Sequence, residues 1–343
     1  MAAVGVVAPS EWRRYADPST ELEVLRLTDP AFASGMTAPY LRQFTRRGEM
    51  LLYWSERSGS KQAYLLDMKS GESKSLTEAA ALDPASLALS ADDKSFFFFD
   101  DFKSPLLTEL PFIAGKPREV RRVPEGVVRT GFGLMQDGAA VFTERENGRS
   151  RILSVAKLQP RRIVETEDEI DVVLPRPRRA QLAYRTGDAL FLINADGSGK
   201  RPLKLAPGRT GDVSWTPAGR TLIYLHVPEN PKELITLREH TPEDGTDRLL
   251  AKTSQFISAS ANQDASVFAG ASRSKGSPYV LILLRAAHRE MTLCEHAASD
   301  PAMVRPLFTP DSQNVLFVSD HHGKPAIYLT PVAKFVEATA DAP

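Results

Sequence analysis

The sequence predicts an all-β fold: a seven-bladed β-propeller whose ring is closed by an N-terminal strand that pairs into the last blade. One phrase recurs along the 343 residues: an apolar residue, a short polar turn and a run of apolar residues. Its copies begin 40 to 48 residues apart, a period typical of four-stranded propeller blades. They begin at Phe44, Leu89, Leu134, Leu174, Trp215, Ser260 and Phe308.

A second hairpin follows the phrase within each repeat. In the first repeat it contains the apolar run 63–67, a turn at Gly71 and the short run 74–77. The fourth repeat has the same order, with the run 189–194 and a glycine-rich turn at 196–199. Turns with glycine favour hairpins between antiparallel strands. Each repeat is therefore predicted to be a sheet of four strands.

The last repeat lacks an outermost strand, because little chain follows its run 326–330. Residues 23–28 have the pattern of an outer strand but no preceding blade. Pairing this segment into the seventh blade would close the ring and remove exposed sheet edges. We therefore expect one domain over residues 1–343. Residues 1–30 form the entry segment and closing strand, 31–330 the seven blades and 331–343 a C-terminal tail.

Composition narrows the class of partner. The 43 basic and 43 acidic residues cancel, so no overall field favours nucleic acid or an anionic membrane. A single cysteine, Cys294, excludes an internal disulfide and is expected to be a buried, inert thiol. No apolar run approaches the roughly 20 residues that span a bilayer. The apolar stretch 2–9 is too short for a signal peptide, which favours a cytoplasmic location. The oligomeric state stays open.

Familiar catalytic motifs are absent from the sequence. It contains no Gly-x-Ser-x-Gly elbow, His-Glu-x-x-His, paired Cys-x-x-Cys or Walker loop. The neighbours His321 and His322 fall in a hairpin turn, where adjacent side chains diverge, so a shared metal is not expected there. His240 and His288 lie in polar sequence and are expected to be solvated.

Ligands of propellers usually bind over the central channel, near the start of each innermost strand. Counting back three and five residues from each repeat start selects positions whose polar members fall mainly in blades three to seven. Two arginines suit bidentate recognition of a carboxylate, and the acids suit roles as bases or cation ligands. The alternative is that these charges hydrate the channel mouth or pair with one another. The set contains Arg129, Glu169, Asp171, Asp212, Gln255 and Arg305.

Two parts of the chain resemble the oligogalacturonate lyase family. Residues 11–18 and 24–32 resemble the family's entry segment, and 51–67 its first blade. The last-blade phrase 308–311, on to 328–329, is also similar. The blade phrase alone is shared with TolB-type propellers, so the entry segment favours the lyase family.

This resemblance implies a seven-bladed propeller that binds manganese through histidines and a glutamine. It also implies cleavage of short oligogalacturonides by β-elimination, a step of pectin breakdown. In that chemistry a cation and arginines neutralise the uronate carboxylate, which acidifies the proton on C5, and a base removes this proton. The implied partner is an acidic oligosaccharide.

The positions that the resemblance assigns to the metal are changed in this chain. The glutamine and two histidines of the last blade correspond to Asp300, Met303 and Arg305. The metal histidine before the fifth inner strand corresponds to Asp212, and the base before the fourth to Asp171. A thioether and a guanidinium do not replace imidazole as ligands of a hard divalent ion. Manganese or another divalent cation would therefore depend on Asp212 and Asp300.

Three hypotheses follow. The first is a lyase of this type with a remodelled site, metal-free and either active or inactive, in which Asp171 and Arg305 are catalytic. The second is a non-catalytic propeller that holds an acidic sugar or another small anion over the channel, with Arg305 as the anchor and with Arg129, Glu169, Asp212 and Gln255 as further ligand-binding residues. The third is a protein-interaction propeller that uses an exposed face or the long insert 100–126. That insert carries the basic group Lys116, Arg118, Arg121 and Arg122.

Overall fold

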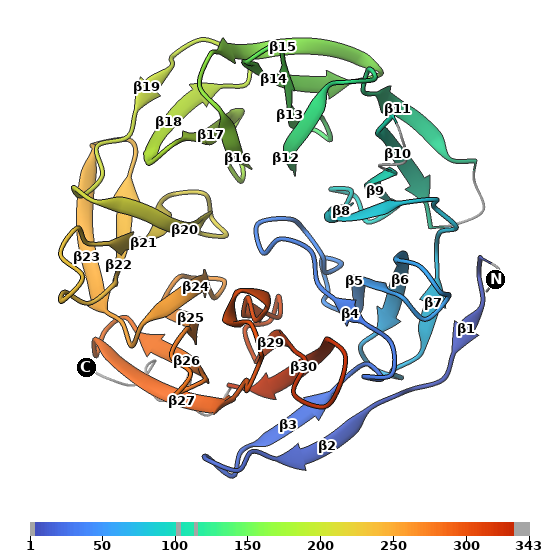
Figure 1. Ribbon diagram of the computed structural model, residues 1–343, viewed down its shortest axis with the longest axis vertical. Helices are drawn as coiled ribbons and strands as arrows, with labels where there is room; N and C mark the ends of the chain where they lie inside the picture. Colours follow the sequence, from blue (N-terminus) through green and yellow to red (C-terminus); the bar gives the residue numbers. More distant parts are fainter. Residues whose placement is uncertain (1–3, 101–103, 113–115, 333–343) are drawn as a thin grey trace.

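Antiparallel sheets form a ring in the computed structural model, which describes residues 4–100, 104–112 and 116–332. Within these residues there are seven sheets of four or five strands, arranged as blades around a common centre (Figure 1). The predicted all-β, seven-bladed propeller is confirmed. In the described ranges no helix is long and apolar enough to cross a membrane.

Blades one to four follow one another along the chain. Blade one contains β4 (Ser34–Gly35), β5 (Met50–Ser55), β6 (Gln62–Asp67) and β7 (Ser73–Ser75). Blade two contains β8 (Leu82–Leu89), β9 (Ser95–Asp100), β10 (Leu106–Pro111) and β11 (Arg118–Arg122). Blade three contains β12 (Val128–Leu134), β13 (Ala140–Glu146), β14 (Arg149–Ala156) and β15 (Gln159–Thr166). Blade four contains β16 (Ile170–Pro175), β17 (Gln181–Thr186), β18 (Ala189–Asn194) and β19 (Arg201–Pro202).

Blades five to seven complete the ring. Blade five contains β20 (Arg209–Trp215), β21 (Leu222–Val227), β22 (Thr236–Thr241) and β23 (Thr246–Lys252). Blade six contains β24 (Phe256–Ala261), β25 (Val267–Ser272), β26 (Tyr279–Leu284) and β27 (Arg289–Glu295). Blade seven contains the chain's last strands, β28 (Leu307–Phe308), β29 (Asn314–Ser319) and β30 (Ala326–Pro331). The short 3₁₀ helix η1 (Pro301–Met303) lies between blades six and seven in the sequence.

In blades two to seven the repeated phrase marks the end of the innermost strand and leads into the second. β8 ends at Leu89, β12 at Leu134 and β20 at Trp215, and these are the predicted first residues of three repeats. Second strands are buried on both faces because neighbouring blades cover them; all four phenylalanines of 96–99 in β9 are buried. Cys294 is also fully buried, and burial raises the pKa of its thiol well above the ordinary value. The prediction of a buried thiol is confirmed.

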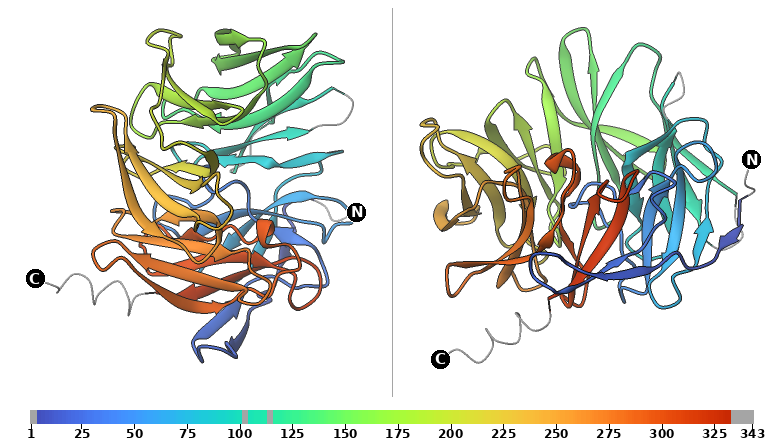
Figure 2. Two further views of the ribbon diagram at one scale, coloured as in Figure 1. Left: turned by 60° about the vertical axis from the view of Figure 1, so that its left-hand side comes forward. Right: turned by 60° about the horizontal axis from the view of Figure 1, so that its bottom comes forward.

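The N-terminal segment closes the ring, as predicted. β3 (Glu23–Arg26) pairs antiparallel with β30, and the Leu27 N–H donates to the Ile327 carbonyl at 2.8 Å. β2 (Arg13–Ala16) adds a further strand outside β3, and β1 (Val7–Ala8) pairs with β7 of blade one. These two additions were not predicted. Figure 2 shows the dark blue β1–β3 segment along the outside of the ring.

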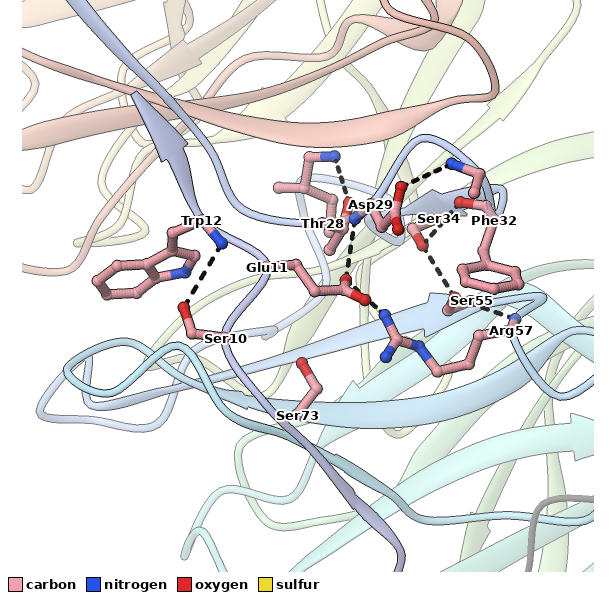
Figure 3. A network of polar contacts seen from close by, with 12 residues as sticks. Ser10, Glu11, Trp12, Thr28, Asp29, Phe32, Ser34, Ser55, Arg57 and Ser73 are labelled. Atoms are coloured by element: carbon pink, nitrogen blue, oxygen red, sulfur yellow. Dashed lines mark hydrogen bonds and ion pairs between the residues drawn. The ribbon is translucent and has the colours of Figure 1, made fainter. Parts of the chain in front are cut away.

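A carboxylate fastens this entry segment to blade one. The Glu11 carboxylate accepts a hydrogen bond from the Asp29 N–H at 2.9 Å and pairs with the Arg57 guanidinium at 2.5 Å (Figure 3). The side chains of Arg57 and Glu11 are only 13% and 20% exposed. Arg57 also lies 5.7 Å from the ring centroid of Phe32. The pair therefore links three segments that are separate in the sequence.

The segment 100–126 is not an insert, so that part of the interaction hypothesis was wrong. It supplies β10 and β11, the third and fourth strands of blade two. The basic side chains of β11 pair with carboxylates: Arg118 with Glu109, Arg121 with Glu144 and Arg122 with Glu119. Residues 101–103 and 113–115 of this segment, and 333–343 of the predicted tail, lie outside the described residues.

We predict that Glu11→Ala lowers the free energy of unfolding by about 2 kcal/mol, because it removes two charge-assisted hydrogen bonds from a shielded position. The control is Arg14→Ala in β2. Its 3.2 Å pair with Glu23 is exposed, with side-chain exposures of 66% and 53%. That control should change stability by less than about 0.5 kcal/mol. Denaturant unfolding measures both, and equal losses would contradict the role given to Glu11.

Candidate functional site

Irregular pairing at the beginning of the inner strands directs side chains to the centre of the ring. β8, β12, β16, β20 and β24 each show a register shift with their second strand. A β-bulge places an additional residue in one strand and redirects its side chain. Residues within these shifts line a cavity of about 560 Å³: Gly131, Asp171, Gly211, Asp212 and Ile257.

Strands of blades two to six line this central cavity, together with a segment of blade one and the segment that precedes blade seven. In Figure 1 the segment between β4 and β5 and the segment with η1 project toward the centre of the ring. They supply Tyr40 on one side and Arg305 on the other. The cavity brings together four of the residues that the sequence selected: Arg129, Asp171, Asp212 and Arg305.

The other three selected residues do not line the cavity. Glu169 is exposed just before β16. The Gln255 side-chain oxygen accepts two hydrogen bonds from Arg273, at 3.0 and 3.2 Å. Asp300 caps η1, where its carboxylate accepts the Ala302 N–H at 2.9 Å. Counting back three or five residues from each repeat start therefore predicted cavity-lining residues correctly in some blades and incorrectly in others.

Two of the cavity's arginines are held by carboxylates. Arg129 pairs with Asp83, and its guanidinium carbon lies 4.1 Å from the ring centroid of Phe99. Arg185 of β17 binds both oxygens of Asp171, with an Nη2 to Oδ2 distance of 2.7 Å. It also donates to the Gly211 carbonyl at 3.0 Å. Arg129 and Asp171 are therefore neutralised, although by partners outside the selected set and not by one another.

Arg305 has no carboxylate partner within the described part of the chain. It follows η1 and has a positive φ of 36°, an unfavourable conformation for a residue with a side chain. It lines the cavity and lies near enough to Asp212 to lower the pKa of that carboxyl. Arg305 is thus a cavity cation that remains available to an anion.

Asp212 is a carboxyl group held in a confined position. Its Oδ2 accepts the Ala259 N–H at 3.0 Å, which connects blade five to blade six. Burial raises the pKa of Asp212 above its usual value, against the opposing effects of this hydrogen bond and of Arg305. A carboxyl group with a raised pKa is suited to exchanging protons near neutral pH.

Sequence reasoning missed Tyr40, because blade one has only the two-residue β4 in place of a regular inner strand. A rigid turn presents this side chain. The buried Gln43 accepts the Thr37 N–H at 3.1 Å and donates to the Ala38 carbonyl at 3.2 Å. Tyr40 is 37% exposed as a whole residue, yet partial burial of its phenol raises the pKa, so the hydroxyl stays protonated at neutral pH. Its hydroxyl has no hydrogen-bond partner among the described residues.

Ser258 is a second polar residue that the sequence did not single out. It lines the cavity, is 6% exposed, and its hydroxyl lacks a partner within the described structure. A buried hydroxyl without a partner is costly, so a ligand that binds it recovers free energy. Neither residue has a sequence signal, because Tyr40 lies in the irregular segment between β4 and β5 and Ser258 lies in β24 beside its register shift.

The residues around the cavity do not fit a histidine-held metal ion. None of the six histidines lines it. His296, for example, has a structural role, because its ring nitrogens contact backbone groups: the Ser272 carbonyl at 2.9 Å and the Ala298 N–H at 3.1 Å. Across the described ranges, no three or more His, Cys, Asp or Glu residues are grouped to hold a metal. We therefore derive no chemical step through a cation.

We predict that Asp212→Asn stabilises the protein at neutral pH. A raised pKa in the folded state means that folding binds protons, so stability is lost as the pH rises from the unfolded to the folded pKa of Asp212. Asparagine carries no charge, so it avoids the free-energy cost of burying an ionised carboxylate, and its side-chain oxygen still accepts the Ala259 N–H. Thermal unfolding should show a higher Tm for the variant at pH 7. The gain should shrink below the ordinary aspartate pKa, and a pH-independent difference would contradict the prediction.

The fold and cavity define a seven-bladed β-propeller with a polar cavity at its centre. Residues 2–141 match the family model described as oligogalacturonate lyase. An oligogalacturonide lyase of Pectobacterium atrosepticum is 23% identical, over 96% of this chain and 98% of that protein. An oligogalacturonate lyase of Dickeya dadantii is 22% identical, over 93% and 95%.

A solved structure agrees with this likeness. An oligogalacturonate lyase in complex with manganese superposes with a TM-score of 0.90 at 24% identity, over 96% of this chain and 98% of that one. The structural likeness establishes the fold. Together with the sequence matches, it confirms the resemblance to the oligogalacturonate lyase family that the entry segment predicted.

Proposed function

We propose that this protein binds the carboxylate of a short oligogalacturonide in its central cavity, through a remodelled site that uses Arg305 where the resemblance implies a metal ligand. The observation that carries the proposal is the difference in charge state among the three arginines that line the cavity. Arg129 and Arg185 are neutralised, whereas Arg305 is not. A guanidinium binds a carboxylate with two parallel hydrogen bonds.

The unpaired hydroxyls favour a sugar acid over a simple anion. Tyr40 and Ser258 line the same cavity as Arg305. A uronate ring carries hydroxyls and a carboxylate on one scaffold, so it can satisfy all three groups together. The resemblance to lyases that act on oligogalacturonides supports the same ligand class.

We predict that Arg305→Ala weakens digalacturonate binding about 10- to 100-fold, the loss expected for a hydrogen-bonded pair of opposite charges. Isothermal titration calorimetry with chelator present measures the affinity without a metal. Arg47→Ala is the matched control, because Arg47 is exposed in the turn before β5 and does not line the cavity. Unchanged affinity in Arg305→Ala would remove Arg305 as the anchor.

A second candidate function, β-elimination, is favoured by the position of Asp212 near Arg305. Neutralisation of the uronate carboxylate by Arg305 acidifies the proton on C5. Asp212 removes this proton, a double bond forms between C4 and C5, and the C4–O4 bond breaks. The protonated Tyr40 phenol gives its proton to the departing O4. This assignment uses a base and an acid whose pKa values are both raised.

Asp171, which the resemblance places at the base, is less suited to that role. Both of its carboxylate oxygens accept hydrogen bonds from Arg185. A carboxylate paired in this way orients a neighbour and would have to break the pair to take a proton. We therefore assign Asp171 the positioning of Arg185 and assign proton removal to Asp212.

We predict that Asp212→Asn abolishes formation of the unsaturated product while digalacturonate still binds. In the parent protein, kcat/KM should rise with pH through a pKa above the usual aspartate value, because only the ionised carboxylate accepts a proton. Chromatography detects the product, with manganese in one arm and chelator in the other. Binding without product in both arms would leave the protein a non-catalytic uronate binder. Activity that requires manganese would contradict the metal-free site.

A further inference from the structure

A second cavity opens beside the central one, between blades one and two. Its volume is about 390 Å³. One wall is the turn between β5 and β6, with Glu56, Ser60 and Lys61, and the other is the segment 80–82, where β8 begins. We call this cavity the side groove.

The side groove adjoins the central cavity at Asp83. This residue lines the groove, and its carboxylate pairs with Arg129, which lines the central cavity. The other oxygen of Asp83 accepts the Ala85 N–H at 3.0 Å. Because both oxygens are engaged, the shared wall carries little free negative charge that would repel an anion.

Lys61 gives the groove a cation. Its Nζ lies 5.4 Å from the ring centroid of Trp54, a position that favours a fixed ammonium group. Within the described residues Lys61 forms no ion pair, including none with Glu56, the groove's remaining acid. An unpaired cation is therefore present in each of the two adjoining cavities, Arg305 in one and Lys61 in the other.

We propose that the side groove is a subsite for an additional uronate residue, whose carboxylate binds Lys61. This rests on the proposed function, because it requires a uronate chain anchored at Arg305. An oligogalacturonide carries one carboxylate on every ring, so a chain that extends beyond the central cavity presents another carboxylate at the groove. The ligand class is then an oligogalacturonide longer than a disaccharide.

Calorimetry with di-, tri- and tetragalacturonate tests this subsite. The parent protein should bind one of the longer ligands about three- to fivefold more tightly than the dimer, the gain expected for a partly exposed ion pair. Lys61→Ala should lose this gain and leave dimer affinity unchanged, whereas Lys61→Arg should keep it. Lys74→Ala in β7 is the matched control, since Lys74 is an exposed lysine of the same blade outside both cavities.

The outcomes separate the two proposals. Equal affinity for all three lengths, or a gain that persists in Lys61→Ala, overturns the subsite while loss of binding in Arg305→Ala still supports the central site. Absence of binding for every length overturns both. Thermal unfolding of each variant confirms that it is folded, and Lys61→Arg tests the charge if Lys61→Ala is unstable.

Discussion

The pairing of β3 with β30 is the constraint on which the rest of the molecule depends. It joins residues near the two ends of the chain and turns a row of seven sheets into a ring. The buried Thr28 reinforces it, because its hydroxyl accepts the Ile327 N–H at 3.0 Å. Since every blade packs on two neighbours only in a closed ring, the central cavity exists only when this pairing is made.

The bulges in the inner strands convert this closed scaffold into a site. A regular strand would alternate its side chains between the two faces of its sheet, where neighbouring blades cover them. The register shifts instead turn Asp171 and Asp212 toward the axis. The same residues then link the blades: Asp171 holds Arg185, which donates to Gly211, and Asp212 accepts the Ala259 N–H. Site and scaffold therefore share their hydrogen bonds.

The state of the charges, more than their number, determines what the cavity can bind. Arg129, Arg185 and Arg305 face the acids Asp83, Asp171 and Asp212, which would give a neutral set. Two pairs are formed, whereas burial favours the neutral form of Asp212 and Arg305 has no carboxylate partner in the described chain. This electrostatic arrangement, together with the unpaired hydroxyls, favours an acidic sugar.

The sequence alone determined the number of blades, the strand order and the closure of the ring, because burial between blades imposes a period that apolar residues must follow. It also located Arg129, Asp171, Asp212 and Arg305 in the cavity, whereas Glu169 and Gln255, chosen by the same interval, lie outside it because the inner strands differ in length. It could not identify Tyr40, Arg185 or Ser258, which reach the cavity through an irregular loop, a second strand and a register shift. Only the tertiary structure decided which charges pair, because a salt bridge depends on distances between blades that no local pattern records.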